Sequence, residues 1–192
     1  IGVFAMTDKG LKGVTNPSAI FLSTHSEPVP GSCVLVTLEG TRPLLVEIQA
    51  LIVRLASGAT PRRAVVGWDN GRLAMLLAVL EARCGLNFSS CEVYLNVAGG
   101  YRLGDPAADL AVAAALISAL ADRPLPNDAV WFGEVSLAGE VRPVAHGALR
   151  LKEAAKLGFA KAFGPGDGTG MAKGHREIAL LRNLVDQVMG GS

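Results

Sequence analysis

The sequence contains few aromatic and few charged residues. Of its 192 residues only 5% are aromatic and 18% are charged, although half are hydrophobic. The core must therefore be built from aliphatic side chains, mainly those of Ala, Val, Leu and Ile. Because charged residues usually make up about a quarter of a globular domain, we expect another subunit to cover part of this surface.

Other absences exclude whole classes of protein. The three cysteines, Cys33, Cys84 and Cys91, have no paired spacing, which is typical of reduced thiols in a cytosolic protein rather than of a disulfide framework. No histidines and cysteines cluster with the spacing of metal ligands. The longest uncharged apolar stretch, residues 110–121, is too short to cross a bilayer, and no signal peptide is visible. We therefore expect a cytoplasmic protein without a membrane partner.

The length suits one domain with a small appendage. Residues 1–31 are rich in turn-forming residues, and we expect them to form a leading segment or linker with little regular structure. Because the chain begins at Ile1 and not at a methionine, we expect another domain to precede this segment. Residues 32–192 would then form the domain itself.

Strand and helix patterns follow one another without strict alternation, which indicates an α+β fold. The β-rich segments on either side of a Gly-Thr turn predict a hairpin over residues 32–53. Residues 129–145 predict a second hairpin that turns at 137–139. Helices are expected over 69–85, 107–121 and 147–157, and a last strand and helix over 176–190.

The stretch LGDPAADLAVAAALISAL, residues 103–120, combines a tight turn with a helix that is apolar almost all round. Such a helix must be buried on nearly every side. The N–H groups at its start can stabilise an oxyanion, so the turn is a suitable place for a nucleophile. It carries Ala107 and Ala108 instead. Asp105 and Asp109 either face each other there as a carboxylate pair or, as we favour, complement the helix dipole.

Other candidate sites are weaker. The loop GPGDGTGMAKGH, residues 164–175, is similar to a phosphate cradle but lacks the G-K-[ST] ending, so we interpret it as a surface loop. Serines stand at positions 89, 90, 118 and 136, and none has an evident base nearby in sequence. The residues alone therefore predict no catalytic set.

Residues 94–165 resemble the proteolytic domain of the Lon family. DPAADLAVAAALISALADRPLPNDAVWFGEVSLAGEVRPV is similar to the Lon order of a G-P-S-A-G turn, a buried helix, a G-E-[IV]-x-L-x-G-x-V-x-P hairpin and a helix that carries a lysine. In Lon proteases the serine of the turn is the nucleophile and the lysine is its base. Gly133, Glu134, Gly139 and Pro143 match the hairpin motif. The resemblance implies the Lon proteolytic-domain fold, which is related to domain 2 of ribosomal protein S5.

The hairpin motif also fixes the alignment of the two catalytic positions. Counting back from it places Ala107 at the serine position, and counting forward places Arg150 at the lysine position. A methyl group cannot attack a carbonyl carbon, and an arginine stays protonated and cannot act as a base. The resemblance therefore implies a degenerate dyad and a domain that is not itself an enzyme.

A second resemblance covers almost the whole chain. The segments IGVFAMTDKGL, EGTRPLLVEIQALI, NVAGGYRL, PAADLAV, GEVSLAGEVRPV and EAAKLGF are similar, in this order, to the C-terminal part of the bacterial RadA (Sms) family. In that family a zinc finger and a RecA-like, DNA-dependent ATPase precede a Lon-like domain. The resemblance implies that zinc, ATP and magnesium belong to those preceding domains, and no cofactor is expected in this chain.

The same resemblance implies a function. The family forms a hexameric ring that acts in branch migration during recombination and DNA repair. We expect this chain to be a non-catalytic Lon-like scaffold domain of such a protein. Its implied partners are other copies of itself, single-stranded or branched DNA, and a recombinase of the RecA type. The alternative is an ATP-dependent Ser/Lys peptidase domain of the Lon type that uses displaced residues.

The net charge of +1 indicates no partner by itself, but a local basic patch can still bind DNA. The candidates are Arg62 and Arg63 beside a turn, and Arg150, Lys152 and Lys156 on the third helix. Lys152 and Lys156 are four residues apart and so share a helix face. A merely solvated basic face is the alternative interpretation.

Overall fold

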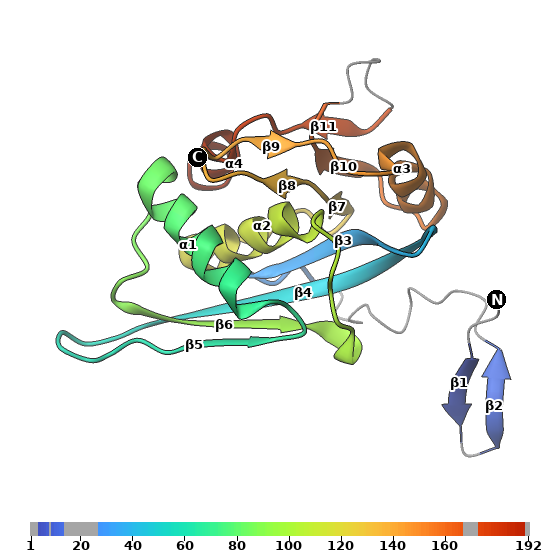
Figure 1. Ribbon diagram of the computed structural model, residues 1–192, viewed down its shortest axis with the longest axis horizontal. Helices are drawn as coiled ribbons and strands as arrows, with labels where there is room; N and C mark the ends of the chain where they lie inside the picture. Colours follow the sequence, from blue (N-terminus) through green and yellow to red (C-terminus); the bar gives the residue numbers. More distant parts are fainter. Residues whose placement is uncertain (1–3, 8, 14–26, 167–172, 191–192) are drawn as a thin grey trace.

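The computed structural model describes residues 4–7, 9–13, 27–166 and 173–190. Within them seven strands form one sheet in the order β11-β10-β7-β3-β4-β6-β5 (Figure 1). These strands are β3 (Ser32–Glu39), β4 (Arg42–Arg54), β5 (Arg63–Val66), β6 (Cys91–Val97), β7 (Ala129–Trp131), β10 (Lys161–Gly164) and β11 (His175–Glu177).

The sheet is mixed. The β3–β4 and β4–β6 pairs are antiparallel, whereas the β10–β11, β7–β10, β3–β7 and β5–β6 pairs are parallel. The predicted hairpin over residues 32–53 is confirmed, because β3 and β4 are joined through Gly40 and Thr41. A mostly parallel sheet with antiparallel members is compatible with the α+β expectation.

The helices are α1 (Asn70–Cys84), α2 (Ala108–Ala121), α3 (Gly147–Lys156) and α4 (Leu181–Met189). The expected caps of α1 are confirmed, since Asp69 accepts the Arg72 N–H at its start and Gly85 ends it with a left-handed backbone. Among the described residues, no helix combines the length and hydrophobicity that crossing a membrane requires.

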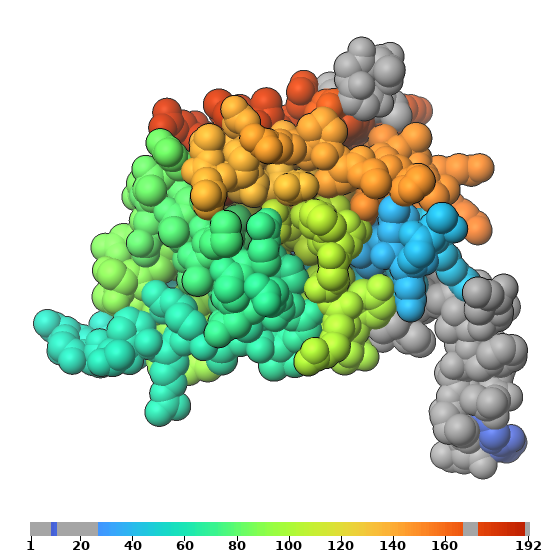
Figure 2. Space-filling view, in the orientation of Figure 1, coloured from blue at the N-terminus to red at the C-terminus, as the bar shows by residue number. Residues whose placement is uncertain are grey.

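Helix α2 is the centre of the core. It packs on β3 and β4, and α1 and α4 pack against it. Figure 2 shows α1 at the front of the molecule, with the segment of residues 130–156 above it. Every residue from Ala108 to Ser118 is buried, as the absence of a polar face predicted. Small alanine side chains let neighbouring elements approach this helix closely.

The structure refines one expectation and corrects another. Within residues 1–31, where little regular structure was expected, β1 (Phe4–Thr7) and β2 (Gly10–Gly13) form a short antiparallel hairpin. The prediction of a single hairpin over residues 129–145 is wrong. Its first part, β7, joins the main sheet beside β3 and β10, and only β8 (Glu134–Val135) and β9 (Val141–Arg142) pair as a hairpin. Alternation along the chain cannot show where one strand leaves a sheet and another begins.

Candidate functional site

The turn that precedes α2 is closed against the core. Ala107 stands at the N-cap position with a helical backbone, and its side chain is fully buried. Its N–H donates to Asp105 Oδ1 at 3.0 Å. Gly133, just before β8, donates to the Ala107 carbonyl at 2.9 Å and accepts the Leu110 N–H at 3.0 Å. The start of α2 therefore faces packed protein and not an open cleft.

Arg150 lies beside this turn, although it is 45 residues away from Asp105 in sequence. It is the largest of the fully buried side chains, with 1% of its surface exposed. Its Nη1 and Nη2 donate to the two carboxylate oxygens of Asp105 at 2.6 and 3.2 Å. Nη1 also donates to the Val36 carbonyl at 2.8 Å, and Nε donates to the Ala145 carbonyl at 3.0 Å. The guanidinium thus joins α3 to β3 and to the turn before α2.

Asp105 collects further donors from β3. Its Oδ2 accepts the Thr37 hydroxyl at 3.1 Å and the Leu38 N–H at 3.2 Å. Burial raises the pKa of the Asp105 carboxyl, but the hydrogen bonds and charge of Arg150, with the N–H groups of Ala107 and Leu38, outweigh it and leave the pKa below its ordinary value. Asp105 is therefore ionised and forms a buried, bidentate ion pair with Arg150.

Asp109 faces different partners. Its side chain is 2% exposed, accepts the Val135 N–H at 3.0 Å and forms an ion pair with Arg72 of α1. Burial is the largest influence on it and raises the pKa of its carboxyl in spite of the donors from Val135 and Arg72. Asp105 and Asp109 therefore do not form a carboxylate pair. They fix the first turn of α2 to β3 and α3 on one side and to α1 and β8 on the other.

The side chains at this site decide what chemistry it offers. It offers a methyl group at position 107 and a guanidinium whose N–H groups are bound to oxygens. No group of three His, Cys, Asp or Glu residues in the described ranges is placed to hold a metal ion. The structure thus brings together the two positions, Ala107 and Arg150, that the hairpin motif assigned to the dyad.

The basic candidates divide into two kinds. Arg150 is buried, so its inclusion among DNA-contacting residues was wrong: a side chain already bound to Asp105 is not presented to a phosphate. Arg63 is exposed as a residue, but its guanidinium donates to the carbonyls of Phe88 and Cys91 and ties β5 to the turn before β6.

Arg62, Lys152 and Lys156 are exposed. They do not form one patch, because β5 begins at the left of the molecule and α3 lies at its right (Figure 1). The sharing of a helix face by Lys152 and Lys156 is consistent with the observed helix. No local pattern indicates Thr37 or Arg72, whose roles depend on contacts between distant segments.

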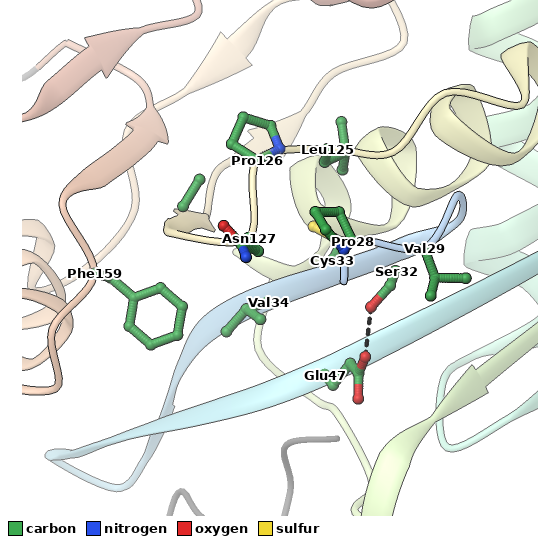
Figure 3. Close-up of a pocket in the computed structure, with 11 residues that line it drawn as sticks. Pro28, Val29, Ser32, Cys33, Val34, Glu47, Leu125, Pro126, Asn127 and Phe159 are labelled. Carbon is green, nitrogen blue, oxygen red and sulfur yellow. Dashed lines mark hydrogen bonds between the residues drawn. The ribbon is translucent and has the colours of Figure 1, made fainter. Parts of the chain in front are cut away.

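A separate small cavity of about 130 Å³ lies between β3, β4 and the loop before β7. Figure 3 shows Glu47 at one side of it, with the Ser32 hydroxyl donating to a Glu47 oxygen. Phe159 and Asn127 lie at the other side. Burial and the Glu47 carboxylate raise the pKa of the Cys33 thiol, which disfavours the reactive thiolate form. Positions 167–172 of the predicted surface loop 164–175 lie outside the residues that the structure describes.

Comparison with known proteins identifies relatives over most of the chain. Residues 70–167 match the family described as subunit ChlI of Mg-chelatase. A Brucella abortus protein named DNA repair protein RadA is 56% identical over 98% of this chain and 41% of its own length. Proteins of the same name from Pseudomonas aeruginosa and Escherichia coli are 56% and 55% identical over 86% of this chain and 36% of their own lengths. The chain spans about two fifths of the curated relatives it matches. It therefore belongs to the ChlI family and, as its motifs predicted, is a homologue of bacterial DNA repair protein RadA over most of its length.

Proposed function

We propose that this chain is a non-catalytic, Lon-like scaffold domain of a RadA-type DNA recombination and repair protein. In this proposal it supports a hexameric ring and contacts DNA during branch migration. The observation that carries the proposal is the buried Asp105–Arg150 pair beside Ala107. The relatives named DNA repair protein RadA support the repair context.

A Ser/Lys peptidase requires a hydroxyl nucleophile and an amine that can lose its proton. The turn offers neither at the two positions that the motif assigns. The displaced-residue alternative is weak as well. Ser118 is fully buried, accepts the Gly31 N–H and donates to the Arg123 carbonyl. Ser136 accepts the Glu140 N–H at the turn of the β8–β9 hairpin, so its hydroxyl oxygen takes part in the turn.

The peptidase question has a direct test. We expect no turnover of unfolded casein by this chain, alone or joined to its ATPase partner domain. A matched double variant, Ala107→Ser with Arg150→Lys, restores both side-chain types and shows whether the turn still supports the chemistry. Turnover by the wild type that survives repurification and is blocked by a serine-directed inhibitor would contradict the proposal.

Self-association is supported by apolar side chains on the outer face of the sheet. Leu51 and Val66 are each 60% exposed and Val53 is 37% exposed. Leu51 lies opposite Tyr94 on β6, and Tyr94 lies opposite Ala64 on β5, so this apolar surface crosses three strands. A ring uses one heterologous interface repeated around its axis. Light scattering over a concentration series is the test, and a strictly monomeric mass would remove ring assembly from this chain alone.

DNA contact is proposed for the exposed cations Arg62, Lys152 and Lys156. Contacts of this kind go mainly to phosphates and position the protein without reading sequence. In the full-length protein, Lys152→Ala with Lys156→Ala should weaken DNA binding. Each lost contact should also reduce the slope of log affinity against log salt by about 0.7–0.9. Arg142→Ala, a change at an exposed arginine paired with Glu140, is the matched control. Unchanged affinity and slope in the double variant would place the DNA path elsewhere. The same proposal includes sites for ATP, magnesium and zinc in other domains of the protein, and a recombinase of the RecA type as a partner.

A further inference from the structure

A small pocket lies beside the start of α3, and one of its lining residues, Phe132, also faces the Arg150 guanidinium, whose Cζ is 6.0 Å from the ring centroid. We call it the His175 pocket. It has a volume of about 40 Å³. Its apolar walls include Phe132, Val144, Leu151 and Pro165, and the first residue of α3, Gly147, forms another part of its wall. One cavity therefore joins the end of β7, the segment after β9, the start of α3 and the end of β10.

His175 is the polar side chain of this pocket. It is 4% exposed, and neither Nδ1 nor Nε2 has a hydrogen-bond partner among the described residues. Burying a polar group without a partner is costly, so such a group in a folded protein requires an explanation. The surrounding side chains, Phe132, Val144 and Pro165, offer no hydrogen-bonding atom. Among the described residues of the pocket, the imidazole therefore has no hydrogen-bond partner.

The start of α3 adds a second set of donors. The first N–H groups of a helix have no acceptor within the helix and carry a partial positive charge. Helix α3 has ten residues, no side-chain cap and no acidic residue in its first turn. A Cβ added at Gly147 would meet no atom within 4 Å, so the space there is open. Glu177 lies at the rim against Gly166, and because it is exposed its charge is screened by solvent.

We propose that the His175 pocket binds a small carboxylate, either a free short-chain acid or the carboxylate of a peptide. A helix N-terminus and an imidazole both donate hydrogen bonds to an anion, and the apolar walls accept the hydrocarbon part. One water needs about 10–15 Å³ of such space, so the pocket accommodates a group of a few heavy atoms. A cation is disfavoured by the helix end, and a plain hydrocarbon would leave His175 without a partner. This site is independent of the DNA role proposed above.

The test uses the complete 192-residue chain with propionate as the probe and propionamide as its neutral isostere. Ligand-observed NMR measures binding, and the imidazole resonances of His175 report the site. We expect saturable binding of propionate with a dissociation constant of about 1–10 mM, which is reasonable for five heavy atoms, and none of propionamide. His175→Phe should weaken binding about tenfold or more, as for the loss of one charge-assisted hydrogen bond.

Two further variants keep the result interpretable. Gly147→Asp leaves His175 in place and puts a competing carboxylate at the helix start, so it should also weaken binding about tenfold. Arg176→Ala removes the neighbouring exposed charge on β11 and should leave binding unchanged. Equal binding of propionamide, binding that does not saturate, or an equal loss in Arg176→Ala would overturn the proposal. A peptide with a free C-terminus that binds more tightly than both its amide and propionate would identify a chain terminus as the source, and tighter binding of propionate would identify a free acid.

Discussion

Replacing Arg150 by methionine tests whether the buried ion pair holds the domain together. The substitution keeps a long side chain but removes the charge and the hydrogen bonds that the guanidinium donates to Asp105, Val36 and Ala145. Removing one partner of a buried ion pair typically costs about 3–5 kcal/mol, because the other charge remains buried. The Asp105 side chain is only 10% exposed.

Asp105 would nevertheless keep three donors, which limits the loss. The N–H groups of Leu38 and Ala107 and the Thr37 hydroxyl all remain. We therefore expect Arg150→Met to lower the free energy of unfolding by about 3 kcal/mol, at the low end of that range. Urea denaturation measures the change, and Lys152→Met on the exposed face of α3 is the control, with an effect within about 0.5 kcal/mol.

The pH dependence separates electrostatic loss from packing loss. The folded-state pKa of Asp105 lies below its unfolded value, so its contribution is present above the unfolded pKa and is lost as pH falls through the folded pKa. The stability difference between wild type and Arg150→Met should therefore shrink below about pH 4. A change under about 1 kcal/mol at neutral pH, or a difference that stays constant into acid, would refute the ion-pair reasoning.

Two further changes test the same core. The pKa of Asp109 is raised in the folded state, so its effect has the opposite sign: folding gains stability from its protonation as pH falls. Asp109→Asn should therefore lower the stability of the fold less at pH 7 than near pH 4, which is about the unfolded pKa of the carboxyl. A difference in urea midpoint between wild type and variant that stays constant across this range would contradict the raised pKa of Asp109. Gly31 has φ +86°, and an added Cβ would overlap the Ala50 carbonyl oxygen. Gly31→Ala should cost at least about 2 kcal/mol. Gly40 has φ +63° with open space around it, so Gly40→Ala should lower the free energy of unfolding by only about 1–2 kcal/mol. Thermal or urea unfolding measures both losses. Equal losses would mean that a small shift relieves the contact at Gly31.

Local patterns predicted the elements that their own residues define. The Asp69 cap, the Gly85 stop and the leucine spacing specified α1, and the Gly-Thr turn between two β-rich segments specified the β3–β4 hairpin. The strand after residue 175 was predicted less well, because β11 ends at Glu177 and residues 181–189 already form α4. The placement of β7 in the main sheet depends on pairing with β3 and β10, which no local pattern encodes.

The sequence by itself determined that α2 is buried, that position 107 carries no nucleophile and that position 150 carries a permanent charge. These properties follow from side-chain chemistry and helical periodicity, which do not depend on distant residues. Only the tertiary structure decided that Arg150 is buried and paired with Asp105 and that Asp109 turns away to Arg72. It also decided that the imidazole of His175 has no hydrogen-bond partner within the part of the chain that the structure describes. Burial and pairing are properties of contacts between segments far apart in sequence. From the sequence, Arg150 is therefore only a basic residue on a helix and a candidate for the surface, whereas the fold places it in a buried ion pair with Asp105.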